Sequence, residues 1–431
     1  MPFERALRAV YSLGMAAAQP LLRRKLRRRG QAEPGYLEAV EERFGRYAGP
    51  ADGAAARPVW IHAVSLGETR AVGVLVAALR ARLPGMRLLL THGTATGRAE
   101  GRKLLLSGDA QAWLPWDTPG AVSRFLAHFR PAVGLLMETE VWPNLVAGCR
   151  AAGVPLALVN ARLSDKSLRE AARLALLSRP AFAGLSAVWA QTEDDARRLR
   201  GLGAPVAGVF GNLKFDLAPD PALLEAGRRW RRAVGRPVLM LASSREGEEA
   251  QWLDAVKGLP PSVQWLVVPR HPQRFDEVAG LLSAGGLGVS RRSGWTTTGP
   301  DDAPPGADVW LGDSLGEMAL YYGLADAALL GGSFADTGGQ NLIEAAACGC
   351  PVVMGPSTFN FSEAAVLAEA GGAALRVADM AEAARTAVAL VTDPGRSGRV
   401  RDAALAFAAA HRGAAARSAD AVRALLAAVS A

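Results

Sequence analysis

The sequence predicts two α/β domains, each built on a parallel β-sheet with helices on both faces. Short, almost continuously apolar runs alternate with amphipathic stretches, as is typical of strands buried in parallel sheets. The 431 residues exceed the ~250–300 at which a single hydrophobic core stops growing. Half of the residues are hydrophobic and 21% are charged, which excludes a largely disordered chain.

The expected strands follow in order along both halves, and the segment 217–221, which contains two prolines, connects the halves. We therefore assign residues 31–216 and 217–431 to two Rossmann-like domains that face a central cleft, with ligands at the carboxyl ends of the strands. The Ala-rich tail, residues 379–431, should form helices that close the structure. The expected strands are 58–64, 87–90, 132–137, 154–159, 187–190, 206–209, 237–242, 263–268, 308–311, 325–330 and 351–354.

Residues 1–30 carry most of the net charge, +7 of the chain's +8. Their apolar stretch, residues 9–22, is shorter than the ~20 residues that a membrane span needs, and six basic residues lie within 23–29. We expect a membrane-anchoring basic helix on an anionic leaflet; an ordinary terminal helix with a solvated charged face is the alternative. Because the remaining residues are nearly neutral, nucleic-acid binding loses its main support.

Charged side chains follow the expected strands of the first half. Glu68 lies in the turn after strand 58–64, where a carboxylate can act as a general base or only favour a helix N-terminus. Glu138 and Glu140 follow strand 132–137 and should either act on a ligand or pair with cations. Lys214, at the domain junction, faces a ligand or solvent. The hydroxyl-rich run 91–97 suits an anion, a sugar or a plain turn.

The second half holds five loops of a ligand-binding type at expected strand ends: 242–249, 269–272, 312–317, 331–333 and 338–344. Their glycines let the backbone approach a ligand, and the helices that follow favour phosphate. Arg270 beside His271 suits a phosphate or carboxylate. Glu344 lies about one helical turn beyond Asn341, from where a carboxylate can bind ribose hydroxyls. One such loop is a weak signal, but five in one half are hard to attribute to chance.

Other kinds of chemistry have little support in the sequence. HExxH and paired CxxC motifs are absent, so no metal site is expected, and the three cysteines are too few for a disulfide framework. The absence of a Walker lysine motif and of a GxSxG elbow argues against an NTPase and a serine hydrolase.

Six separated motifs follow one another along the chain: WIHAVSLGE (60–68), ETEVWPN (138–144), NARLS (160–164), GNLKFD (211–216), VPRHP (268–272) and GPSTFNF (355–361). Together they resemble the bacterial 3-deoxy-D-manno-octulosonic acid (Kdo) transferases, from about residue 36 to residue 408. The resemblance implies a GT-B glycosyltransferase that moves Kdo from CMP-Kdo to a lipid A precursor (lipid IVA) in lipopolysaccharide biosynthesis. It also implies an N-terminal membrane anchor and a place on the cytoplasmic side of the cell inner membrane.

The resemblance further implies roles for single residues. Glu68 matches the general base, and Glu138 and Lys214 match positions that support the transition state. Gln340 and Arg245 depart from the family, which usually has histidine at both positions, and NLIE (341–344) stands in place of Asn-Pro-Leu-Glu. The positions that match the CMP-binding segments are Pro269, Arg270, Leu315, Gly316, Glu317, Asn341, Leu342, Ile343 and Glu344.

These features predict an inverting transfer that needs no metal or other cofactor, because CMP leaves as an anion that loop amides and Arg270 can stabilise. Three alternatives stay open: a GT-B transferase that uses a UDP-sugar, a two-lobed binding protein without catalysis, and an epimerase or phosphorylase on the same fold.

Overall fold

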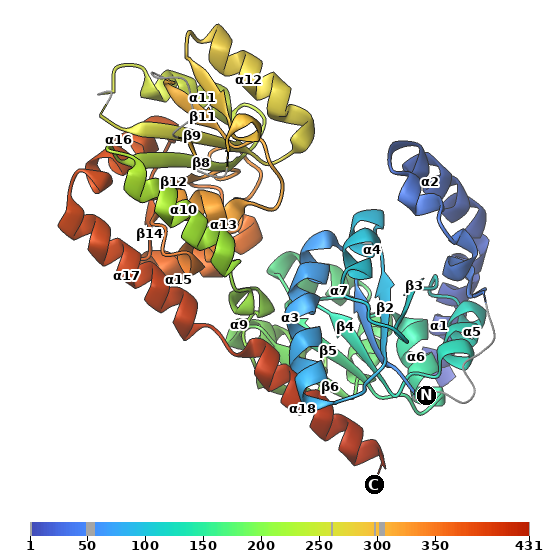
Figure 1. The fold of residues 1–431 in the computed structure, drawn as a ribbon. Coiled ribbons are helices and arrows are strands. Elements are labelled where there is room, and N and C mark those ends of the chain that lie inside the picture. Colours follow the sequence, from blue (N-terminus) through green and yellow to red (C-terminus); the bar gives the residue numbers. More distant parts are fainter. Residues whose placement is uncertain (1, 49–56, 260–261, 297–298, 301–306, 431) are drawn as a thin grey trace. The chain divides into compact units, whose positions relative to one another are not determined.

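The structure is a computed structural model that describes residues 2–48, 57–259, 262–296, 299–300 and 307–430. The chain divides into two compact units: unit 1 comprises Met1–Asp216 and Arg412–Ala431, and unit 2 comprises Leu217–His411. Each unit contains a seven-stranded parallel sheet flanked by helices (Figure 1). This architecture confirms the predicted fold class.

The sheet of unit 1 has the strand order β3-β2-β1-β4-β5-β6-β7, so the strand order reverses between β1 and the middle strand β4. Alternate residues of the strands pack on α3 and α18 on one face and on α5, α6, α8 and α9 on the other. The strands are β1 (Val59–Ala63), β2 (Leu88–His92), β3 (Ala110–Trp113), β4 (Val133–Met137), β5 (Leu156–Ala161), β6 (Ala187–Ala190) and β7 (Val206–Val209). The helices are α1 (Pro2–Ala17), α2 (Gln19–Ala32), α3 (Leu66–Arg82), α4 (Ala95–Arg102), α5 (Pro119–Phe129), α6 (Pro143–Ala151), α7 (Asp165–Arg173), α8 (Ala175–Ala183), α9 (Glu193–Gly201) and α18 (Ala414–Ser430), with 3₁₀ turns Pro34–Leu37, Val40–Phe44 and Leu213–Asp216.

The sheet of unit 2 repeats this plan with the order β10-β11-β9-β8-β12-β13-β14. One of its faces packs on α11, α12 and α16. The strands are β8 (Val238–Ser244), β9 (Gln264–Pro269), β10 (Val289–Arg291), β11 (Val309–Leu311), β12 (Ala327–Leu330), β13 (Val352–Met354) and β14 (Ala374–Arg376). The helices are α10 (Pro221–Ala233), α11 (Glu248–Val256), α12 (Phe275–Ala284), α13 (Met318–Leu324), α14 (Leu342–Ala347), α15 (Ser362–Ala370), α16 (Met380–Val391) and α17 (Pro394–Ala410).

Every strand expected from the sequence is present, and no strand end differs from its expected position by more than two residues. Three further strands, β3, β10 and β14, were not expected from the sequence, and they are three of the four edge strands of the two sheets. These strands have three or four residues each and are only partly buried, so they lack a continuous apolar run.

The N-terminal segment forms two helices, α1 and α2, that pack on unit 1. The hydroxyl of Tyr11 donates a hydrogen bond to Asp117, and the Oγ of Ser12 lies 3.1 Å from the Oδ1 of Asn144. In α2, Leu26 and Gly30 are buried, and Gly30 lies against Leu37. No helix within the described ranges combines the length and the apolar character that crossing a bilayer requires. The attachment of residues 1–30 to a membrane surface stays a prediction.

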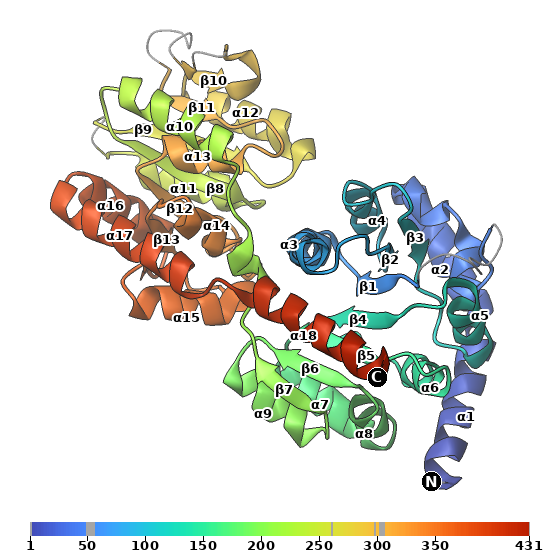
Figure 2. The ribbon, with the colours of Figure 1, turned by 60° about the horizontal axis from the view of Figure 1, so that its bottom comes forward.

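The last helix differs from the expected domain boundaries. We expected residues 217–431 to form one domain, but α18 belongs to unit 1 and packs along α3 (Figure 2). The carboxylate of Asp216 accepts hydrogen bonds from the N–H groups of Gly413 (2.5 Å) and Ala415 (2.6 Å). An ion pair of 2.6 Å joins Arg82 to Asp420. Ala414, Ala415, Ala419 and Val422 of α18 are buried in the hydrophobic core of unit 1, which holds the last helix on that unit.

Candidate functional site

The carboxylate of Glu68 is fixed at the carboxyl end of β1, which pairs with the middle strand β4 of unit 1. Ser65 is the N-cap of α3 and its hydroxyl donates to Oε1 of Glu68 (2.8 Å), while the N–H of Val64 donates to Oε2 (2.9 Å). Ser65 and Glu68 thus form a capping box, which is the structural role expected of an acid at this position. The same bonds hold the carboxylate in one orientation beside the end of the sheet.

Burial raises the pKa of Glu68 above its ordinary value, and the negative charge of Glu138 raises it further, although the hydrogen bonds from Val64 and Ser65 act in the opposite direction. Burial and the charges of Glu68 and Glu138 also raise the pKa of Glu140, whose carboxylate accepts a hydrogen bond from the indole of Trp142 (3.0 Å). These three carboxylates come from the neighbouring strands β1 and β4. A carboxylate with a raised pKa in such a place is suited to accept a proton near neutral pH.

Glu138 is 8% exposed and has a left-handed backbone with φ of 56°. Its carboxylate lies 2.7 Å from the Nε of Arg162 and 3.9 Å from the Nζ of Lys214. Of the two roles considered for this acid, pairing with cations is therefore confirmed. The pairing also brings together Glu138 and Lys214, two of the three predicted catalytic residues, with the guanidinium of Arg162 beside them.

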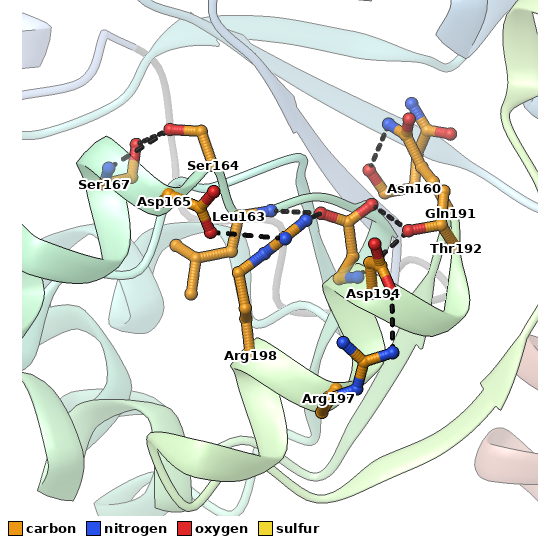
Figure 3. Close-up of polar contacts among 11 residues, drawn as sticks. Asn160, Leu163, Ser164, Asp165, Ser167, Gln191, Thr192, Asp194, Arg197 and Arg198 are labelled. Carbon is orange, nitrogen blue, oxygen red and sulfur yellow. Dashed lines mark hydrogen bonds and ion pairs between the residues drawn. The ribbon is translucent and has the colours of Figure 1, made fainter. Parts of the chain in front are cut away.

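The loop that carries Arg162 is anchored to α9 through Asp195. Figure 3 shows Leu163 and Ser164 of this loop beside Thr192, Asp194 and Arg198. The carboxylate of Asp195 accepts hydrogen bonds from the N–H of Leu163 (2.8 Å) and the hydroxyl of Thr192 (2.8 Å), and it pairs with Arg198 (3.1 Å). Asn160, which precedes this loop, has a φ of 54° and accepts a hydrogen bond on its main-chain carbonyl from Gln191 (2.9 Å). The guanidinium of Arg162 is therefore held beside Glu138 by a rigid loop.

The run 91–97 serves the fold. The hydroxyl of Thr91 accepts a hydrogen bond from the buried indole of Trp60 (2.8 Å), and Thr94 is the N-cap of α4. Burial lowers the pKa of His92 to about 4, so this imidazole is neutral at neutral pH. The plain turn considered for this run therefore accounts for the hydroxyl groups of Thr91 and Thr94.

In unit 2, four neighbouring strands, in the order β11-β9-β8-β12, carry the predicted ligand loops at their carboxyl ends. Glu248, which is fully buried, ties two of these loops together. Its Oε2 accepts hydrogen bonds from the N–H groups of Arg245 (2.8 Å) and Gly332 (2.7 Å). Its Oε1 accepts from Phe334 (3.0 Å) and Ala335 (3.2 Å). One carboxylate therefore sets the shape of the loops after β8 and β12.

Positive charge is concentrated after β8 and β9. The Nη1 of Arg245 donates to the Nε2 of His271 (2.6 Å), and the N–H of Arg270 donates to the carbonyl of Ser244 (3.0 Å). Burial lowers the pKa of His271, and Arg245, Arg270 and Arg274 lower it further. The imidazole is thus neutral at neutral pH, and the arginines around it suit an anion such as a phosphate.

The loop after β11 holds the predicted residues 315–317. Leu315 is exposed, and Gly316 has a φ of 83°, which favours glycine. The carboxylate of Glu317 pairs with Arg292 (2.8 Å) and accepts a hydrogen bond from the hydroxyl of Ser314. The side chain of Glu317 is thus already paired within unit 2, so the main-chain N–H and C=O groups of this loop are the ones that could contact a ligand.

The predicted residues 341–344 form the start of α14. Asn341 is the N-cap, and its Oδ1 accepts a hydrogen bond from the N–H of Ile343 (3.2 Å). Leu342 and Ile343 are buried in the core, so only their backbone could contact a ligand. Burial raises the pKa of Tyr322, and the charges of Glu344 and Arg270 act on it in opposite directions.

Comparison with known proteins identifies the family. The chain is 50% identical to the 3-deoxy-D-manno-octulosonic acid transferase of Bordetella pertussis over 427 residues, which cover 96% of this chain and 98% of that relative. The chain belongs to the Kdo transferase family. The model of the 3-deoxy-D-manno-octulosonic-acid transferase (kdotransferase) family matches residues 38–217. The enzyme of the same name from Haemophilus influenzae is 33% identical, over 83% of this chain and 84% of that relative.

Solved structures support the fold of this Kdo transferase family member. Anabaena HepE in complex with UDP has a TM-score of 0.58 at 14% identity, covering 86% of this chain and all of that one. UDP-GlcNAc 2-epimerase from Neisseria meningitidis has a TM-score of 0.55 at 14% identity, covering 86% of this chain and 99% of that one. At such identities the likeness concerns the fold alone.

Two residues of this Kdo transferase family member had no individual role in the sequence analysis, although both lie in segments that it singled out. Arg162 lies in the NARLS motif and pairs with Glu138, and Glu248 lies in the loop after β8 and orders two ligand loops. A polar run that follows a buried strand was the available signal for both. Their partners could not be inferred because they come from other strands.

Proposed function

We propose that the chain transfers Kdo from CMP-Kdo to a lipid A precursor (lipid IVA), with inversion at the anomeric carbon, as a step of lipopolysaccharide biosynthesis. Membership of the Kdo transferase family supports the reaction class. The observation that carries the mechanism is Glu68, whose carboxylate is fixed by Val64 and Ser65 and has a raised pKa.

In this proposal, Glu68 accepts the proton of an acceptor hydroxyl while that oxygen bonds to the anomeric carbon of Kdo. The bond between the anomeric carbon and the phosphate oxygen of CMP breaks, and CMP leaves with the electron pair. The transition state resembles an oxocarbenium ion, as in other glycosyl transfers. Glu138, Arg162 and Lys214 form the charged group that supports it from unit 1.

The donor nucleotide is proposed to bind at the carboxyl ends of β8, β9, β11 and β12. Arg270 and its neighbouring arginines suit the phosphate, and the backbone of 315–317 and 341–343 suits the cytidine. Glu344 is proposed to accept hydrogen bonds from the ribose hydroxyls. The direct assay of the function incubates the protein with CMP-Kdo and a tetra-acylated lipid A precursor and follows the product by mass spectrometry. Each added Kdo gives a fixed mass increment, whereas transfer from a UDP-sugar alone would contradict the proposed donor.

Glu344→Ala should weaken CMP binding about tenfold, because the ribose loses a charged hydrogen-bond acceptor. Isothermal titration calorimetry with CMP measures this loss. Glu363→Ala, in the exposed first turn of α15, is the control and should bind CMP as the wild type does. Unchanged affinity of the Glu344 variant would remove its ribose role.

Transfer should continue in excess EDTA, because cationic side chains and backbone N–H groups are proposed to stabilise the leaving phosphate. Within the described ranges, no group of three or more His, Cys, Asp or Glu side chains is placed to hold a metal ion. The transfer rate with EDTA and with added Mg²⁺ is the measurement. An absolute requirement for Mg²⁺ would contradict this part of the mechanism.

We also propose that the protein acts at the cytoplasmic side of the cell inner membrane. Five cations of α2, Arg24, Lys25, Arg27, Arg28 and Arg29, are exposed and suit an anionic leaflet, to which each basic residue contributes ~1 kcal/mol. Arg23, by contrast, pairs with Glu41 (2.7 Å) and lies over the ring of Phe44. Part of the basic cluster therefore holds α2 on unit 1, and the remainder is available to lipid headgroups.

A further inference from the structure

A pocket of about 400 Å³ lies between α1, α6 and α8 in unit 1. These three helices contact one another at the edge of the unit (Figure 2). Its walls are Pro143, Val146 and Ala147 of α6 and Leu176, Leu177 and Pro180 of α8. The pocket is also lined by Arg5 and Arg8 of α1 and by Arg150 of α6. None of these residues belongs to the candidate catalytic group.

Positive charge predominates in this pocket, because three guanidinium groups face one carboxylate, that of Glu4. In the part of the chain that the structure describes, Arg5, Arg8 and Arg150 form no ion pair within 4 Å. Guanidinium groups bind phosphate oxygens through paired, charge-assisted hydrogen bonds. The pocket is therefore suited to a phosphate group.

Apolar side chains surround the same pocket. Leu176 lines it and is 59% exposed, and Leu174, just before α8, is exposed as well. Large apolar side chains so close to a cationic pocket indicate a ligand that carries both a phosphate and hydrocarbon.

We propose that this pocket binds the phosphodiester headgroup of an anionic phospholipid, with the acyl chains lying along Leu174 and Leu176 of unit 1. The inference rests on the proposed membrane attachment and deepens it, because it adds a defined headgroup site to the dispersed charge of α2. Bound in this way, the lipid would hold unit 1 at the bilayer surface through the exposed side chains of Leu174 and Leu176.

The test uses the full chain and a short-chain phosphatidylglycerol below its critical micelle concentration, so that no bilayer is present. Calorimetry compares the wild type with Arg8→Gln/Arg150→Gln and with the uncharged pocket-filling variant Ala147→Leu. The matched control is Arg24→Gln/Arg28→Gln, which removes the same charge from α2. Inorganic phosphate and short-chain phosphatidylcholine serve as further ligands, and unfolding midpoints verify that each variant folds.

We expect both pocket variants to bind the short-chain phosphatidylglycerol at least about tenfold more weakly and the α2 variant to bind it as the wild type does. Equal binding by wild type and pocket variants would overturn the proposal, as would inorganic phosphate binding as tightly as the lipid. Cosedimentation with phosphatidylglycerol vesicles tests the attachment separately. If the wild type fails to cosediment, the proposed membrane attachment is wrong. If only the α2 variant fails to cosediment, the membrane attachment is supported, and the calorimetry with short-chain phosphatidylglycerol decides whether the pocket binds the headgroup.

Discussion

Replacing Glu68 by glutamine should lower the rate of Kdo transfer at least ~100-fold, because a general base of this kind contributes roughly 10²–10⁴-fold. Glutamine has the size of glutamate and keeps an oxygen that can accept the hydrogen bond from the N–H of Val64. The turn after β1 should therefore persist. CMP affinity should also persist, since the proposed nucleotide loops belong to unit 2.

The pH dependence gives a second measurement on the same residue. Glu68 acts as a base only when ionised, and burial raises its pKa above the ordinary 4.5. The acid limb of kcat should therefore lie above that value, with activity lost as the pH falls through the raised pKa. Because the folded state favours the protonated form, ionised Glu68 lowers stability as the pH rises from 4.5 through the raised pKa. Glu68→Gln should remove this dependence and unfold at the same temperature as the wild type or higher at neutral pH.

Glu140→Gln is the matched control, since burial raises the pKa of Glu140 too and its carboxylate also lies near Glu138. Its rate of transfer should fall far less than that of Glu68→Gln. Rate measurements at saturating CMP-Kdo and acceptor compare both variants. If Glu68→Gln kept most of its activity, or if Glu140→Gln alone were inactive, the assignment of the base would be wrong.

The central strands of both sheets were predictable, and the reason is their burial. β1, β4 and β5 are buried at every position, so their apolar runs stand out in the sequence. β10 lies at an edge, where only one of its three residues is buried, and its pattern resembles a loop. The place of α18 could not be predicted, because an Ala-rich amphipathic helix indicates that one face is buried but not which sheet it covers.

The candidate site shows the same limit. The positions of Glu68 and Glu138 at strand ends were evident, since a polar residue directly after a buried strand is visible in the sequence. The pairing of Glu138 with Arg162 depends on β4 and β5 being neighbours, which is a property of the sheet. Glu248 is a stronger example, because three of its four N–H partners lie more than 80 residues away along the chain.

Replacing Glu248 by alanine should therefore have the largest effect on stability among these variants. It leaves the N–H groups of Arg245, Gly332, Phe334 and Ala335 without their acceptor. A buried donor without a partner costs ~1–3 kcal/mol, so we expect a loss of at least ~3 kcal/mol even if water reaches one or two of them. In a domain of this size such a loss lowers the unfolding temperature by roughly 6–12 °C. CMP binding should weaken as well, because the loops after β8 and β12 lose their common anchor.

The two-unit architecture makes this prediction specific. Glu248 lies within unit 2, so a calorimetric scan that resolves two transitions should show one shifted and the other unchanged. Glu246→Ala is the control, because Glu246 is exposed two residues away and should leave both transitions in place. Glu248→Gln retains a single oxygen acceptor and should fall between alanine and the wild type. Hydrogen exchange should quicken at the amides of Gly332, Phe334 and Ala335 in the alanine variant, and unchanged protection there would show that the carboxylate does not hold these loops.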